Sequence, residues 1–229
     1  MTSVPVLPTA FVAARQAVHA VAEFVLAGVR HGAIGRIGLQ PGARGVETAP
    51  FGDHHRVVAV DGDELVDRDD DGERRSPITT VRAAAAFFGV EPGIPNKLWT
   101  QVSTVGLDDP LVIEPGAVDA LAAWFAFVTD ALEGLRRDGG ADLDPLTLWP
   151  EGFDLATAGG GVNFGGSPGD VFIAEPYLYV GPHDRPYPAD GGSYWNESFG
   201  AALRYDDITS LDQAVAFFTR GFALTSTGR

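Results

Sequence analysis

The residues with the clearest chemical potential lie in one apolar stretch, "VFIAEPYLYV", from Val171 to Val180. Its alternating pattern predicts a ten-residue strand with a carboxylate, Glu175, at its middle and Pro176 directly after. Because proline cannot donate to a sheet, the strand is expected at an edge or beside a bulge, and bulges often re-aim a side chain next to a binding site. The predicted core face comprises Phe172, Ala174, Pro176, Leu178 and Val180, and the opposite face presents Glu175, Tyr177 and Tyr179.

Two interpretations of Glu175 follow from this pattern. In the first, the carboxylate projects into an aromatic-lined pocket, where burial raises its pKa or where it holds a cation by charge and ring faces. In the second, Glu175 forms a structural ion pair with Arg185 or Arg204, and the tyrosines only cover the sheet. The candidate ligand-binding residues of the first interpretation are Glu175, Tyr177, Tyr179, Trp195, Asp170, Asp154 and Asn163.

Two short motifs match catalytic or metal-binding patterns without their structural context. Ser167 occupies a G-x-S-x-G string, but a strand is predicted after it, whereas a nucleophile elbow requires a helix there. Asp67, Asp69 and Asp71 resemble the first ligands of a calcium loop, but the twelfth position is Ile78 rather than glutamate. We therefore interpret the first motif as a turn and the second as a solvated hairpin tip.

The histidines give no metal-binding pattern. His54 and His55 follow Asp53 in the only local cluster with nitrogen ligands. Neighbouring side chains on a strand point to opposite faces, but the cluster lies in a loop beside Gly52, which weakens that objection and leaves a metal site there as a minor alternative. His19 lies near the apolar stripe of a predicted helix, where a buried, hydrogen-bonded histidine is expected. The chain has no cysteine, which excludes disulfides and thiolate sites. We predict no metal and no cofactor.

The elements that would position these residues are predicted from periodicity and turn residues. Asp-Gly pairs at Asp61 and Asp71 indicate hairpins of an antiparallel meander. Ser210 to Gln213 forms a capping-box pattern that opens the last helix. The predicted helices are Phe11 to Val29, a helix capped by Ser76 and ending at Gly89, Pro115 to Arg137, and the helix after Ser210; strands are predicted at 34–39, 44–51, 56–60 and 63–66, and four more lie in the aromatic-rich second half.

These elements predict an α+β fold, with an N-terminal meander and a C-terminal aromatic-rich antiparallel sheet packed with about four helices. The polar, glycine-rich stretch "RRDGGADLDP" gives a boundary between residues 1–140 and 141–229. The first part is expected to contain a helix, the meander and two further helices. The second is expected to contain the sheet and the final helix, and to form one compact unit with the first.

The charge and composition restrict the partners. With 31 acidic and 16 basic residues the formal net charge is −15, which disfavours nucleic acids and anionic membranes as partners. No secretory signal is recognised, and no apolar stretch approaches the ~20 residues of a membrane span. We therefore expect a cytoplasmic protein with a small-molecule ligand; a homo-oligomer stays open. Lys97 is the only lysine, and this arginine preference indicates a high-GC, actinobacterial genome.

Four segments of the second half, "LWPEGFDLA", "VNFGGSPGD", "EPYLYVGP" and "YWNESFGAALRYDDI", resemble a family of uncharacterised actinobacterial proteins, a domain of unknown function. The shared motifs are Trp-Pro-x-x-Phe-Asp, Ser-Pro-Gly-Asp and Glu-Pro-Tyr-x-Tyr, and the likeness covers residues 146 to 222. The resemblance implies no activity. It implies only that Asp154, Asp170, Glu175, Tyr177 and Trp195 match positions of the family's motifs.

The sequence thus predicts a protein that binds a small polar or cationic ligand on the acidic, aromatic face of its second sheet. Glu175 would be the charged anchor, with Tyr177, Tyr179 and Trp195 as walls and Asp154 and Asp170 as supporting carboxylates. One alternative is an enzyme, a hydrolase or an isomerase, whose paired carboxylates act as general acid and base. Another is a structural or interaction protein without a pocket.

Overall fold

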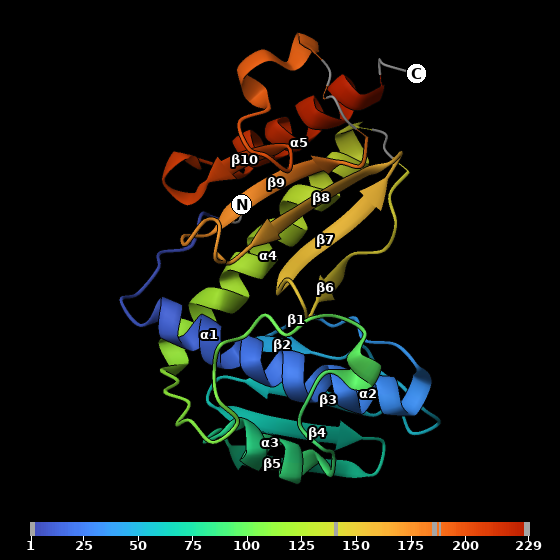
Figure 1. The fold of residues 1–229 in the computed structure, drawn as a ribbon, viewed down its shortest axis with the longest axis vertical. Coiled ribbons are helices and arrows are strands. Elements are labelled where there is room, and N and C mark those ends of the chain that lie inside the picture. Colours follow the sequence, from blue (N-terminus) through green and yellow to red (C-terminus); the bar gives the residue numbers. More distant parts are fainter. Residues whose placement is uncertain (1–2, 140–141, 185–186, 188, 227–229) are drawn as a thin grey trace. The chain divides into compact units, whose positions relative to one another are not determined.

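The computed structural model describes residues 3–139, 142–184, 187 and 189–226. Within them the chain forms two antiparallel five-stranded sheets and four helices, which confirms the predicted α+β fold (Figure 1). Two compact units are present, and each is discontinuous in sequence. We call the unit of Val6–Ala123 and Leu148–Phe153 the meander unit, and the unit of Met1–Pro5, Trp124–Thr147 and Asp154–Arg229 the aromatic unit. The unit boundaries therefore do not coincide with the sequence boundary at residue 140.

The meander unit contains a five-stranded sheet in sequential order β1-β2-β3-β4-β5. The predicted hairpins are present, with Gly62 turning at positive φ between two of the strands. The prediction that Ser76 caps a helix is wrong. Residues 72–77 continue the meander because they pair with the preceding strand along its whole length, and the helix begins after Thr80 instead. The bounds are β1 Gln40–Gly42, β2 Gly45–Glu47, β3 Val57–Asp61, β4 Glu64–Asp69, β5 Gly72–Pro77, α3 Val81–Phe88 and the short 3-10 turn η2 Pro95–Lys97.

One long helix packs its apolar stripe in the core of the meander unit. It comprises α1 (Phe11–Val21), a π-helical turn η1 (Ala22–Leu26) and α2 (Ala27–Ile34). It is therefore longer than predicted. The strand expected at 34–39 is wrong: Ile34 ends the helix, residues 35–38 lie outside helices and strands, and β1 begins at Gln40. By length and composition alone this 24-residue helix, which contains an 18-residue window with a mean hydropathy of 1.3, could cross a membrane, contrary to our expectation that no stretch approaches this length. However, 72% of this apolar window is buried within the protein itself, as in a core helix.

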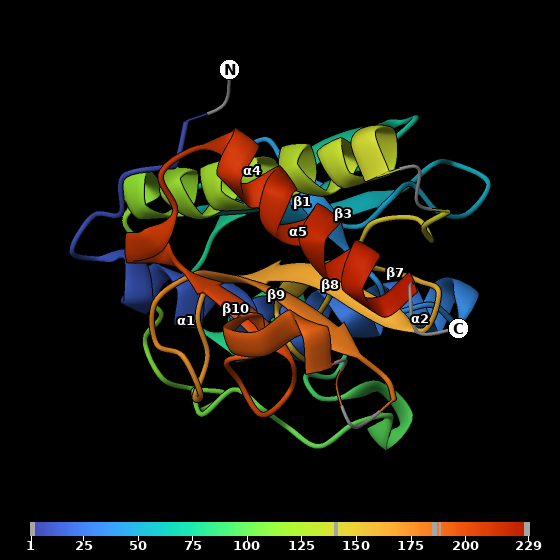
Figure 2. The same ribbon diagram turned by 90° about the horizontal axis from the view of Figure 1, so that it is seen from above.

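The aromatic unit contains the second sheet, in the order β10-β9-β8-β7-β6. Helix α5 and the part of α4 from Trp124 onward cover one face of this sheet (Figure 2). Phe164 of the sheet contacts Phe218 of α5, and both are fully buried. The bounds are α4 Pro115–Gly139, β6 Thr147–Trp149, β7 Asp154–Gly159, β8 Val162–Ser167, β9 Tyr177–Pro182, β10 Ala201–Arg204 and α5 Leu211–Ser226, with 3-10 turns η3 Ala189–Tyr194 and η4 Tyr205–Asp207.

The strand predicted from Val171 to Val180 is wrong in its first half. Only β9 is extended and paired, whereas residues 170–176 form a turn. Asp170 Oδ1 accepts hydrogen bonds from the backbone N–H groups of Phe172 and Ile173, at 2.7 and 2.9 Å. An aspartate that binds nearby amides in this way competes with a strand ladder. As a result Phe172, expected in the core, is 82% exposed.

Candidate functional site

The structure places Glu175 at the surface, in an ion pair. Its Oε1 lies 3.1 Å from Nη1 of Arg204, and Arg204 also binds Glu197 at 2.8 Å. The Glu175 side chain is 42% exposed. A hydrogen bond from its own backbone N–H and the pairing with Arg204 lower its pKa. A buried anchor would show the opposite direction, so the ion-pair interpretation describes this residue. Arg185, the other proposed partner, lies outside the described residues.

Four of the predicted site residues meet on one face of the second sheet. Tyr177 Oη donates to Asp170 Oδ2 at 2.6 Å, Tyr179 Oη donates to Asp154 Oδ2, and the two tyrosine rings are 6.2 Å apart. Burial raises the pKa of both phenols, so they stay protonated donors. Gly165 makes room for Tyr179, since a Cβ there would lie 2.6 Å from its hydroxyl oxygen. Side chains of Ile173, Ala202 and Phe199 pack against these tyrosines.

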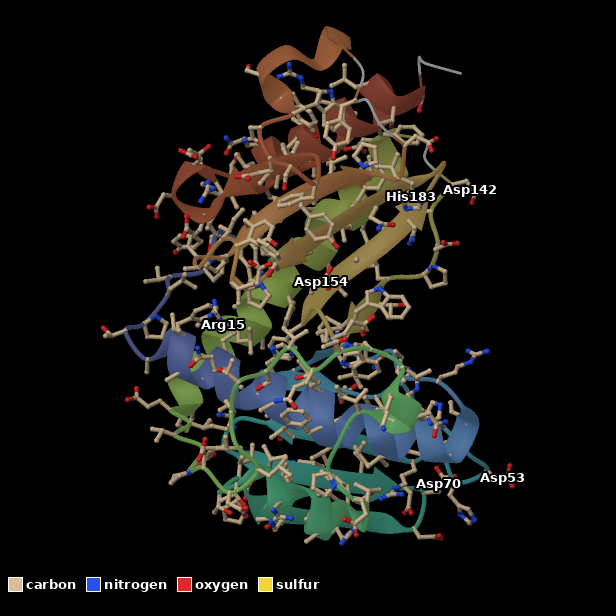
Figure 3. The ribbon with its side chains drawn as sticks, viewed as in Figure 1. Arg15, Asp53, Asp70, Asp142, Asp154 and His183 are labelled. Atoms are coloured by element: carbon tan, nitrogen blue, oxygen red, sulfur yellow. The ribbon has the colours of Figure 1, made fainter. Side chains whose placement is uncertain are left out.

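Asn163 and Trp195 lie elsewhere in the aromatic unit. Asn163 Oδ1 accepts a hydrogen bond from His183 Nε2 at 3.0 Å, at an exposed position. Figure 3 shows His183 beyond the end of β9, at the opposite end of the strands from Asp154. The Trp195 ring packs against Tyr187 and Tyr194, with ring centroids 5.3 and 4.8 Å apart. The predicted set of seven residues therefore divides among four places.

The acidic hairpin tip of the meander is held by arginines and by its own turn. Asp67 accepts hydrogen bonds from Arg56 at 2.8 Å and from Arg74 at 2.5 Å. Asp69 Oδ1 accepts from the backbone N–H groups of Asp71 and Gly72, which closes the β4–β5 turn. These contacts occupy the carboxylates that the calcium-loop pattern would need as ligands.

The histidine pair at the same end of the meander consists of exposed ion-pair partners. His54 lies 3.2 Å from Asp71 and His55 lies 2.9 Å from Asp70. Figure 3 shows Asp53 and Asp70 together at this end. Across the described ranges of the chain, no group of three or more His, Asp or Glu side chains is placed to hold a metal ion.

Ser167 lies at the end of β8, with only 2% of its surface exposed. Its hydroxyl oxygen accepts a hydrogen bond from the backbone N–H of Gly169 at 3.1 Å. The turn after Ser167 leads to β9 and not to a helix, as the sequence indicated. This serine therefore lacks the geometry of a nucleophile elbow.

A cluster that the sequence did not predict as a site lies in the meander unit, along the long helix. It begins with Glu23, a fully buried carboxylate in the π-helical turn. Glu23 Oε1 accepts hydrogen bonds from Trp99 Nε1 at 3.1 Å and from the Val102 N–H at 2.8 Å, and Oε2 accepts from the Ser103 N–H at 2.8 Å. Because all three partners are donors, they complement a carboxylate. Single π turns inside α-helices often occur at functional sites.

His19 lies one turn before Glu23 on the same helix. Its Nε2 is 3.0 Å from the carbonyl oxygen of Pro150, and since a carbonyl only accepts, Nε2 carries the hydrogen. The imidazole stacks on Phe153 with centroids 4.8 Å apart and an interplanar angle of 10°. Burial lowers the pKa of His19, although the charge of Glu23 acts in the other direction. The histidine is thus held as a neutral, oriented ring, as expected for a buried histidine.

Phe153 holds a strained backbone conformation. Its φ is 50° and only 2% of its surface is exposed. A bulky residue in this left-handed region costs about 1–2 kcal/mol and persists only where its surroundings enforce it. Here the enforcing contacts are the His19 ring and a 2.8 Å hydrogen bond from the Phe153 N–H to the carbonyl of Trp149. Leu148 anchors the same segment by two backbone hydrogen bonds with Leu39.

Glu151 is the chemically exceptional member of this segment. Its Oε2 is shielded from solvent and has no hydrogen-bond partner among the described residues. Burial raises the pKa of the Glu151 carboxyl, and the negative charge of Glu23 adds to that effect. Arg15, buried and one turn before His19, contributes the positive charge on this side; Figure 3 shows it on α1. We call Arg15, His19, Glu23, Glu151 and Phe153 the Glu151 cluster.

This cluster combines a strained residue, a π turn and two titratable groups with opposite pKa shifts, which is the pattern of many functional sites. A sequence signal for part of it existed. Arg15, His19 and Glu23 recur every four residues on a mostly apolar helix, which places three ionisable groups on one helix face. Nothing in the sequence joined that face to Glu151, because the two segments are more than 120 residues apart.

Comparison of the chain with protein-family models, curated proteins and solved structures found no match. The resemblance to an actinobacterial family therefore stays a prediction. The functional argument rests on the geometry and electrostatics of the chain's own residues.

Proposed function

We propose that the Glu151 cluster binds a small cationic ligand with N–H donors, such as an ammonium or guanidinium group. The observation that carries the proposal is the shielded, unpartnered Oε2 of Glu151. A buried polar atom without a partner costs about 1–3 kcal/mol, and a ligand donor removes that cost. The ligand class is the one that the sequence predicted, but the anchoring carboxylate is Glu151 instead of Glu175.

The charges around Glu151 favour a cation over an anion. Glu151 and Glu23 supply two carboxyl groups, Arg15 supplies one positive charge, and the depressed pKa of His19 keeps its ring neutral. A cation therefore relieves the repulsion between the two carboxyl groups, which an anion increases.

The test is a thermal-unfolding screen with methylguanidinium and ethylammonium chlorides, against potassium chloride at the same ionic strength. We expect both organic cations to raise the midpoint of the wild type by mass action, and to leave Glu151→Gln unchanged. Glu175→Gln is the matched control, because it makes the same chemical change at an exposed, ion-paired carboxylate. A response that survives in Glu151→Gln and disappears in Glu175→Gln contradicts the proposal and supports a site on the second sheet.

A second candidate, an enzyme with acid/base chemistry, is favoured by one observation at the same place. Burial raises the pKa of Glu151 and lowers that of His19, so a protonated carboxyl and a neutral imidazole can coexist in the Glu151 cluster. Such a pair would donate and accept a proton in a hydrolase or an isomerase. The test is turnover of a panel of esters and amides across a range of pH. A rate that depends on pH in the wild type, and loses that dependence in Glu151→Gln, would support the enzyme. A pH profile that Glu151→Gln leaves unchanged would contradict it.

A further inference from the structure

The segment that joins α3 to α4 contains a strap, residues 93–106, that runs across the long helix of the meander unit (Figure 1). Within the described chain, the hydrogen bonds from the strap to other elements all end on two residues of the π turn. The carbonyl of Phe24 accepts from the Gly93 N–H at 2.9 Å, and the Glu23 carboxylate accepts from Trp99, Val102 and Ser103. One buried side chain thus holds the far half of the strap.

The rest of the strap is poorly tied and strained. Asn96 and Lys97 have consecutive positive φ values of 50° and 55°, which is costly for residues other than glycine. Leu98 is 55% exposed although it is apolar, and Val102, at the end of the strap that Glu23 holds, is 44% exposed. Segments with strained backbone, exposed apolar side chains and few outside hydrogen bonds belong to the low-stability end of a fold. Beyond the strap the chain is fixed again, by the bond from Arg82 N–H to the carbonyl of Leu107.

The residue that holds the strap also acts on Glu151. The charge of Glu23 contributes to the raised pKa of the Glu151 carboxyl, so the two groups are electrostatic neighbours. Because Oε2 of Glu151 is shielded from solvent, a ligand reaches it only after a covering element moves. Three of the hydrogen bonds that hold the strap end on Glu23, the charged neighbour of Glu151, so the strap is the candidate for that element.

We propose that the strap is a lid over the Glu151 cluster and that Glu23 is its latch. The inference rests on the proposed function, because it describes how the cationic ligand enters and leaves that site. When the latch bonds break, the strap opens and Oε2 of Glu151 becomes accessible. When a cation is bound, the three bonds to Glu23 form again and the strap closes over it, as lids do to exclude water.

Lys97 is the only lysine of the chain and lies within the strap, so cleavage at lysine reports on the conformation of the strap. A lysine-specific endoprotease can cut the chain at this one position, and cleavage requires the strap to leave its closed conformation. Glu23→Gln keeps the shape of the side chain but replaces one acceptor oxygen by an NH2 group, so at least one of the three N–H donors loses its acceptor. We expect cleavage of this variant to be about tenfold or more faster than that of the wild type.

Two further variants make the result specific. Glu91→Gln makes the same substitution at an exposed position just before the strap, and is expected to leave the cleavage rate unchanged. Trp99→Phe removes one latch donor and keeps a ring, so it is expected to show a smaller acceleration, and it stands in if Glu23→Gln fails to fold. Circular dichroism confirms that each variant is folded under the conditions of cleavage.

Methylguanidinium chloride is then added, with potassium chloride at equal ionic strength as reference. Slower cleavage of the wild type, without an effect on Glu151→Gln, supports both the site and its lid. Faster cleavage of Glu23→Gln without any effect of methylguanidinium supports the latch and contradicts the proposed ligand. Equal cleavage rates for folded wild type, Glu23→Gln and Trp99→Phe overturn the lid, whether or not methylguanidinium binds.

Discussion

Glu151 and Glu175 show how surroundings, and not residue type, decide what a carboxyl group does. Glu151 follows a proline and Glu175 precedes one, each in an aromatic-rich stretch, and the strand pattern favoured Glu175 as the site residue. In the structure, Arg204 and solvent keep Glu175 ionised, whereas burial and the charge of Glu23 favour the neutral form of Glu151. The raised pKa of Glu151 depends on a distant helix, which no local pattern reveals.

The raised pKa of Glu151 predicts that its contribution to stability depends on pH. Its folded pKa lies above the ordinary value of 4.5, so the folded state binds the proton more tightly than the unfolded state. The contribution is fully present below about pH 4.5 and is lost as the pH rises through the folded pKa. Glutamine does not titrate, so the wild type should lose stability relative to Glu151→Gln between pH 4 and 7.

Urea unfolding of both proteins across this pH range measures the effect. Glu175→Gln should show no such change relative to the wild type above pH 4.5, because the lowered pKa of Glu175 stabilises the folded state throughout that range and its contribution is lost only as the pH falls below 4.5. A difference between wild type and Glu151→Gln that stays constant from pH 4 to 7 would show that Glu151 is not perturbed.

Elements that depend on local signals were predictable, and those that depend on competing contacts were not. Ser210 accepts a hydrogen bond from the Gln213 N–H at 3.1 Å, as the capping-box pattern predicted, and the glycine stop at Gly89 ends α3. The prediction of a strand before Tyr177 was wrong because the Asp170 carboxylate accepts hydrogen bonds from two backbone N–H groups there. The π turn left the apolar periodicity of the long helix nearly intact, so nothing in the sequence marked it.

The start of α3 is a direct test at the scale of one element. Thr80 Oγ1 accepts a hydrogen bond from the Ala83 N–H at 3.0 Å, which satisfies an otherwise unpaired donor. Thr80→Ala should lower the free energy of unfolding by about 1 kcal/mol, measured by urea denaturation. Thr79→Ala, one residue earlier and exposed, is the control. A larger loss of unfolding free energy in Thr79→Ala than in Thr80→Ala would contradict the assignment of Thr80 as the N-cap.

The whole molecule is built from two units that interrupt one another in sequence. The chain leaves the meander unit within α4 and returns to it for the six residues Leu148–Phe153. That return supplies Glu151 and Phe153 to the Glu151 cluster. Composition and turn signals mark loops such as 136–145, but they cannot show that a segment beyond the loop packs back onto the first unit.

A fragment of residues 1–140 therefore lacks part of the meander unit. Without Leu148–Phe153 it loses the ring stacked on His19 and the backbone partner of Leu39. We expect this fragment to unfold without a cooperative transition, as followed by near-ultraviolet circular dichroism during urea titration. A fragment with a sharp transition and native-like signal would mean that the returning segment is dispensable for the fold of that unit.

The pH dependence of methylguanidinium binding tests the central claim most directly, because it reports the ligand and the carboxyl group together. A cation binds the ionised form of Glu151, so calorimetric affinity should increase as the pH rises above 4.5 and through the raised pKa, and then level off. Glu151→Gln should bind weakly at every pH, and Glu175→Gln should follow the wild type. Affinity that is independent of pH, or retained in Glu151→Gln, would contradict a cation site at Glu151.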